Sequence, residues 1–101
     1  MFDGEFFGDS ERRSYRYRIE IPAVLFAAGL SDQMDVRLLN VGEIGCRIST
    51  PVRLRVGDAV TIGFRASPSV QGVVRWSHAQ AAGVEFCSPL PPGLIDKLLD
   101  R

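Results

Sequence analysis

The sequence predicts an all-β fold, a small antiparallel barrel with a short C-terminal helix. Short runs of alternating apolar and polar residues recur along the chain, turn-forming Gly, Pro, Asn and Asp separate them, and only the C-terminal run has helical spacing. The 101 residues are enough for one hydrophobic core and too few for two. We therefore expect one domain over residues 11–101, preceded by a flexible acidic tail over residues 1–10.

The first strand is expected from Tyr15, where apolar and charged residues begin to alternate. Its apolar face consists of Tyr15, Tyr17, Ile19 and Ile21, and its charged face of Arg16, Arg18 and Glu20. Pro22 has no amide proton and belongs at an edge or a bulge, beyond which residues 23–28 continue the strand. After a turn over residues 29–33, a second strand runs from Met34 to Asn40.

A glycine-containing turn follows over residues 40–48. Gly42 and Gly45 allow a positive φ or the close approach of a ligand to the backbone, and Asn40 brings a side-chain amide to the rim. Beyond the turn, we expect Cys46 to face the core and Arg47 to face outward, as a contact behind the site or a plain surface charge.

The second half of the chain contains a further strand, a hairpin and a helix. Val60, Ile62 and Phe64 mark the apolar face of the strand. The hairpin joins residues 70–78 to residues 83–87 through a loop over residues 79–82, and period two places Trp76 in the core beside Val74. The helix lies within residues 91–101, and its apolar stripe, which covers the side or one end of the barrel, consists of Leu94, Ile95, Leu98 and Leu99.

Charge and hydropathy exclude several classes of partner. Twelve Lys and Arg residues offset twelve Asp and Glu residues, which weighs against binding of duplex nucleic acid. The longest apolar run, residues 21–30, is interrupted by Pro22 and Gly29 and is too short to span a membrane. The N-terminus lacks the features of a secretory signal, so we expect a cytoplasmic protein with Cys46 and Cys87 reduced and at least half-buried.

Catalysis is not expected. The one histidine, His78, lies near a hairpin turn with no nucleophile pattern beside it. Cys46 and Cys87 form no C-x-x-C pair, and with a single histidine they do not make a metal site. We therefore predict neither an enzyme nor a metal or cofactor site.

An arginine cluster precedes the first strand. Arg12, Arg13, Arg16 and Arg18 fall within seven residues. Guanidinium groups pair bidentately with phosphates and cannot be titrated away, so the cluster is suited to an anionic ligand. A solvated basic segment with no ligand is the alternative reading of the same spacing.

Four motifs, in this order, resemble the PilZ domain. They are R-x-x-x-R (Arg12 to Arg16, with Arg13 adjacent), N-x-G-x-x-G (Asn40, Gly42 and Gly45), V-R-W (residues 74–76) and G-V-E-F (residues 83–86). The resemblance covers residues 11–100. It implies a six-stranded barrel that binds cyclic di-GMP, often as an intercalated pair of molecules, and acts as a receptor.

The resemblance also implies roles for single residues. Arg12 and Arg16 correspond to the arginines that clamp the phosphates and contact guanine, Asn40 to the residue that reads a guanine edge, and Gly45 to the closing glycine. Gly42 departs from the family pattern, which has Ser there; losing one hydroxyl hydrogen bond costs about 0.5–1.5 kcal/mol. Two charge-assisted arginine contacts, about 1.5–3 kcal/mol each, outweigh this loss.

We expect a switch in which the ligand orders the arginine segment and changes the surface offered to a separate downstream protein. Two other functions stay open. A degenerate PilZ-like adaptor would bind a protein partner with weak or no nucleotide binding, as Gly42 and the acidic tail suggest. An OB-like single-strand binder would stack bases on Tyr15, Tyr17 and Trp76, although period two and zero net charge disfavour it.

Overall fold

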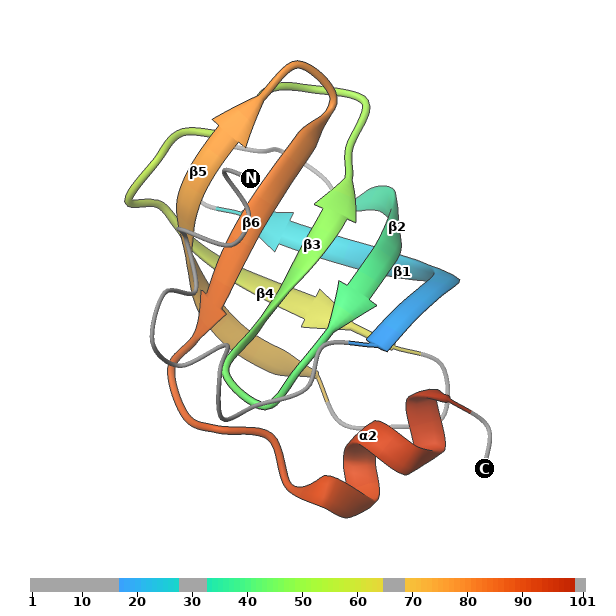
Figure 1. The fold of residues 1–101 in the computed structure, drawn as a ribbon. Coiled ribbons are helices and arrows are strands. Elements are labelled where there is room, and N and C mark those ends of the chain that lie inside the picture. The colour runs from blue at the N-terminus through green and yellow to red at the C-terminus, as the bar shows by residue number, and fades with distance from the viewer. Residues whose placement is uncertain (1–16, 28–32, 65–68, 100–101) are drawn as a thin grey trace.

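The computed structural model describes residues 17–27, 33–64 and 69–99 (Figure 1). These residues form six antiparallel strands and one helix. The strands are β1 (Tyr17–Ala27), β2 (Met34–Val41), β3 (Gly45–Ser49), β4 (Ala59–Gly63), β5 (Val70–His78) and β6 (Ala81–Phe86), and the helix is α2 (Pro92–Leu98). The strands close into a barrel in the order β1-β2-β3-β6-β5-β4, so the predicted fold class is confirmed.

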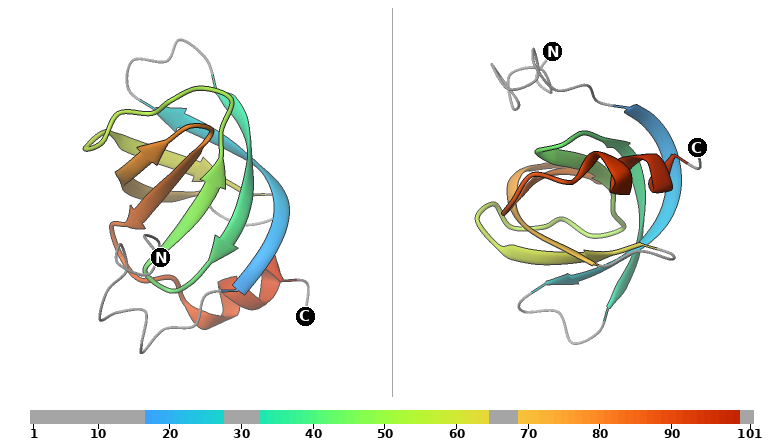
Figure 2. Two further views of the ribbon diagram at one scale, coloured as in Figure 1. Left: turned by 45° about the horizontal axis from the view of Figure 1, so that its top comes forward. Right: turned by 90° about the horizontal axis from the view of Figure 1, so that it is seen from below.

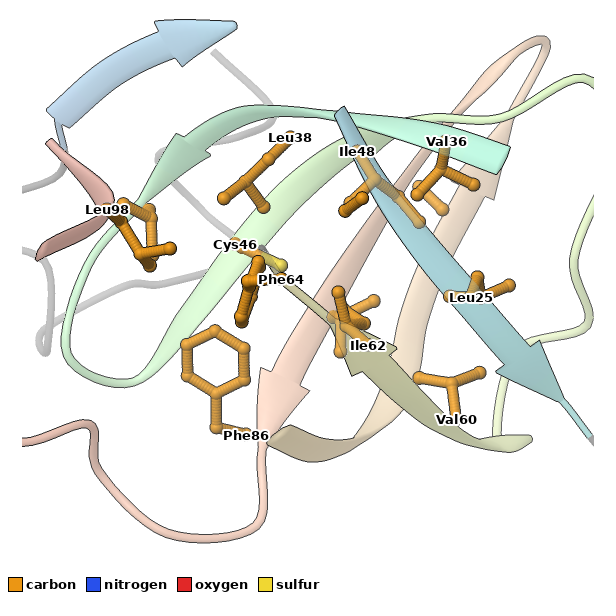
Figure 3. Close-up of a cluster of buried hydrophobic side chains, with 14 of the residues drawn as sticks. Leu25, Val36, Leu38, Cys46, Ile48, Val60, Ile62, Phe64, Phe86 and Leu98 are labelled. Carbon is orange, nitrogen blue, oxygen red and sulfur yellow. The ribbon is translucent and has the colours of Figure 1, made fainter. Parts of the chain in front are cut away.

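The core fills the inside of this barrel, as the alternating pattern predicts. Leu25, Leu38, Ile48 and Ile62 are fully buried, and Figure 3 shows them pointing toward one another from β1, β2, β3 and β4. Cys46 is fully buried among them, as expected. Because successive strand residues face opposite sides, their neighbours in sequence lie on the outer surface.

The long strand β1 pairs with two neighbouring strands. Residues 17–25 pair with β2, and residues 24–27 pair with β4. Pro22 pairs with Arg37 of β2, close to a register shift between Arg18 and Ile21. It lies in the part of β1 that pairs with β2 and not with β4. A residue without an N–H is tolerated there, because it interrupts no second ladder.

Helix α2 closes one end of the barrel. Figure 2 shows it lying across the barrel opening in the view from below. Leu90, Ile95 and Leu98 are buried and belong to the core cluster, while Leu94 and Leu99 are half-buried against it. Pro92 opens the helix, where the missing N–H needs no partner.

Several sequence predictions are corrected by the structure. The hairpin turn is only Ala79 and Gln80, since Ala81 pairs with His78 in β6. Cys87 is exposed, in the bend that follows β6, so the expectation that it is at least half-buried is wrong. Neither Cys46 nor Cys87 is part of a disulfide.

Residues 1–16, with the predicted tail, Tyr15 and the arginines 12, 13 and 16, lie outside the described residues. Within the described part, no helix has the length and apolar character needed to cross a membrane. In the same part, no three His, Cys, Asp or Glu side chains are grouped so that they could hold a metal ion.

Candidate ligand-binding site

Four residues from neighbouring strands form one row across the outer surface of the barrel, here called the outer row. In register order they are Asn40 of β2, Arg47 of β3, Gly83 of β6 and Trp76 of β5. Directly opposed residues of antiparallel strands share one face of the sheet. The row therefore brings arginine, a side-chain amide and an aromatic ring onto a single stripe.

Two β-bulges turn Asn40 and Trp76 outward. The register shifts between Leu38 and Asn40 in β2 and between Val74 and Trp76 in β5. Leu38 and Val74 are fully buried, and strict alternation would send the residues two positions later into the core as well. One extra residue in each strand reverses the face. The prediction that Trp76 lies in the core is therefore wrong.

The indole of Trp76 occupies the space above Gly83. A Cβ atom added at Gly83 would lie 2.6 Å from Cε2 and 2.7 Å from Cδ1 of Trp76, which is closer than real Cβ contacts. The Arg47 Cζ atom lies 5.6 Å from the centroid of the Trp76 ring, within the range of a cation–π interaction. Trp76 is half-buried, so part of the side chain is accessible. The absence of a side chain at Gly83 is what lets the ring lie against the barrel.

Asn40 carries a buried hydrogen-bond acceptor. Its Oδ1 atom is buried and has no hydrogen-bond partner among the residues that the structure describes. Such atoms are rare, because an unpaired buried acceptor costs about 1–3 kcal/mol. The position suits a ligand that presents an N–H donor.

The turn over residues 42–45 is fixed by main-chain hydrogen bonds. The N–H of Gly42 donates to the carbonyl oxygen of Gly45 over 2.9 Å. Two more bonds connect the turn to the end of β6 and the segment beyond it: Phe86 N–H donates to the oxygen of Ile44 over 2.8 Å, and Leu90 N–H to that of Glu43 over 2.7 Å. Gly42 and Gly45 are buried, and neither has a positive φ. The sequence suggested that these glycines provide either a positive φ or room for a ligand close to the backbone. The structure excludes the first of these two roles.

The chain enters β1 beside this turn. Tyr17 pairs with Val41, the residue between Asn40 and Gly42. Arg16 directly precedes Tyr17 in the sequence. Arg12, Arg13 and Arg16 are not among the described residues, so their convergence with the turn stays a prediction.

The chain matches the family model of the PilZ domain over residues 10–101. It belongs to the PilZ domain family. The resemblance deduced from the sequence motifs is thereby confirmed. PilZ domains bind cyclic di-GMP and are ligand receptors, not enzymes. No curated protein matches the chain at a significant level.

Within this PilZ domain, Gly42 and Gly45 lie in the turn that follows Asn40, and Arg47, Gly83 and Trp76 share the outer row with Asn40. The signal for two of these residues was present, because Trp76 ends the V-R-W motif and Gly83 begins G-V-E-F. Their common face could not be deduced from period two, since the bulges that produce it leave no mark in the hydrophobic pattern.

Proposed function

We propose that this PilZ domain is a receptor for cyclic di-GMP, which it binds along the outer row beside the turn over residues 42–45. The observation that carries the proposal is the buried, unpaired Oδ1 of Asn40 in one row with Arg47 and Trp76. Guanine offers N–H donors to an acceptor, O6 and N7 to an arginine, and a planar face to an aromatic ring. Each of the three side chains thus has a complementary group on the base.

The energetic balance favours binding despite Gly42. A missing serine hydroxyl removes about 0.5–1.5 kcal/mol. Stacking of one base on an aromatic ring contributes about 1–3 kcal/mol, and each charge-assisted arginine contact about 1.5–3 kcal/mol. We therefore expect weakened binding, not its loss.

Arg12 and Arg16, with Arg13 between them, supply the phosphate contacts in this proposal. Two phosphates give the ligand two negative charges, which bidentate guanidinium groups recognise. Since β1 begins beside the turn, the ligand orders residues 12–18 against the outer row and changes the surface offered to a separate partner protein. Amide shifts recorded during a titration test this step; unchanged signals for residues 12–18 at saturating ligand would contradict it.

Calorimetry with two dinucleotides tests the receptor itself. Cyclic di-AMP has the same phosphates but lacks the guanine donors, so we expect it to bind at least about tenfold more weakly than cyclic di-GMP. Asn40→Leu removes the acceptor at similar size and should weaken cyclic di-GMP by about tenfold. Arg47→Ala should weaken it similarly, whereas Arg53→Ala, which removes the same charge from an exposed residue outside the row, should not.

Equal affinity for the two dinucleotides, or unchanged affinity in Asn40→Leu and Arg47→Ala, would place the ligand elsewhere. No heat with cyclic di-GMP at about 100 µM would favour the second candidate, a protein-interaction adaptor of PilZ fold. The glycine at position 42, where the family pattern has Ser, is the observation that keeps this candidate.

A further inference from the structure

The outer surface around β4 lies on the side of the barrel opposite the outer row. In the closed order β1-β2-β3-β6-β5-β4, β4 is three places from β3 in either direction, and Figure 1 shows β3 in front and β4 behind. Six outward residues define what we call the β4 face: Val24 and Phe26 of β1, Ala59, Thr61 and Gly63 of β4, and Val73 of β5.

Phe26 projects from the β1 side of this face, next to Thr61 of β4. Its side chain is 46% exposed, whereas Phe64 and Phe86 are buried and Trp76 is half-buried. A hollow of about 350 Å³ lies on the β5 side of Phe26, and another of about 420 Å³ lies on the side of Gln33 and Phe64. Phe26 lines both hollows, so a protruding ring and two recesses are adjacent on one patch.

The β4 face carries no charge. None of the described residues that line the two hollows is charged, although charged residues make up 24% of the chain. Its border is charged: Glu85 pairs in register with Val73 and forms an ion pair of 2.5 Å with Arg75. An aromatic, uncharged centre with a polar rim is the composition of a protein interface, and such a face meets a copy of itself without like-charge repulsion.

We infer that the β4 face is the interface of a symmetric homodimer. In a two-fold dimer the same patch contacts itself, so each protruding group needs a recess on that patch. Phe26 of one protomer can enter a hollow beside Phe26 of its partner, which buries both rings. Eleven of the fifteen residues that line the two hollows are not buried, against about 20–30 per side in a standard interface. An interface below the standard size makes the dimer a reversible one that forms only at higher protein concentration.

Sedimentation of the full chain without nucleotide tests this inference. The weight-average mass should rise from 11.1 kDa toward twice that value as the concentration increases from about 1 µM to about 500 µM. Phe26→Glu should abolish the rise, because it removes the protruding ring and buries a carboxylate from each protomer in the interface. Thr61 is the register partner of Phe26, so Thr61→Glu should also abolish the rise. This variant replaces Phe26→Glu in the test if Phe26→Glu does not fold.

Val52→Glu is the matched control. Val52 is 43% exposed, close to the value of Phe26, and lines neither hollow. This variant receives the same charge and should dimerise like the wild type. A wild type that stays at 11.1 kDa throughout, or Phe26→Glu and Thr61→Glu variants that dimerise like it, would overturn the inference. So would equal loss of the dimer in Val52→Glu. Because no nucleotide is present, none of these outcomes depends on the proposed receptor function.

Discussion

At the scale of single residues, Gly83 is the position on which the site depends most visibly. Gly83→Ala places a methyl group in the space of the Trp76 indole, so the ring must move away from Arg47. If that ring stacks on a base, we expect affinity for cyclic di-GMP to fall by about tenfold. Trp76 is the chain's only tryptophan, so its fluorescence reports the displacement directly, and calorimetry measures the affinity.

Gly63→Ala is the control for this substitution. A Cβ atom at Gly63 would lie 3.8 Å from the Val24 carbonyl oxygen, an ordinary contact, and Gly63 is also an outward-facing strand residue. We expect wild-type tryptophan emission and wild-type affinity. An unchanged affinity in Gly83→Ala, with the emission altered, would show that the ring position does not matter for binding.

Gly42 allows a test in the opposite direction. Its φ is not positive, so serine can adopt the same backbone conformation. If the hydroxyl of the family pattern contacts the ligand, Gly42→Ser should strengthen binding by up to about tenfold, the equivalent of one hydrogen bond. Gly93→Ser, on helix α2 where no atom lies within 4 Å of the new Cβ, should leave affinity unchanged. Weaker binding in Gly42→Ser would show instead that position 42 is packed too closely to accept a side chain.

At the scale of elements, alternation predicted the strands well and failed at the bulges. Val60, Ile62 and Phe64 are buried as period two requires, because β4 has no register shift. β5 does have one, and this is why Trp76 lies outside although Val74 lies inside. A bulge is decided by which neighbouring strands pair and in what register, so it depends on tertiary contacts that a single strand sequence does not encode.

Helix α2 is the element whose contribution to stability is simplest to test. Ile95 is 6% exposed and packs against the core at the barrel end. Ile95→Ala should lower the free energy of unfolding by about 2–4 kcal/mol through lost burial and the cavity left behind. Lys97→Ala, on the exposed face of the same helix, should change it by less than about 0.5 kcal/mol. Denaturant unfolding measures the free energy of unfolding of both variants. If Ile95→Ala loses no more stability than Lys97→Ala, the helix is not part of the cooperative core.

At the scale of the whole molecule, the resemblance to the PilZ domain supplied what periodicity could not. Periodicity indicated a small barrel, and the motifs added six strands and a position for the ligand, of which the strand number is confirmed. The side-by-side placement of residues 40–45 and the start of β1 follows from the pairing of Tyr17 with Val41. Neither strand alone contains that information. The proposed dimer face was not predicted at all, because Phe26 lies in an apolar run that could equally have been core.

The two proposed surfaces lie on opposite sides of the barrel, and this separation leads to a final prediction. The outer row is centred on β3 and the β4 face on β4, so a β4-face dimer leaves one outer row exposed on each side. Ligand binding and self-association should then be independent, because mutations at well-separated sites act additively. Phe26→Glu should bind cyclic di-GMP with wild-type affinity while remaining a monomer. Arg47→Ala should dimerise like the wild type while binding the ligand more weakly. A ligand affinity that changes with protein concentration in the wild type, and not in Phe26→Glu, would instead show that the dimer contributes to the ligand site.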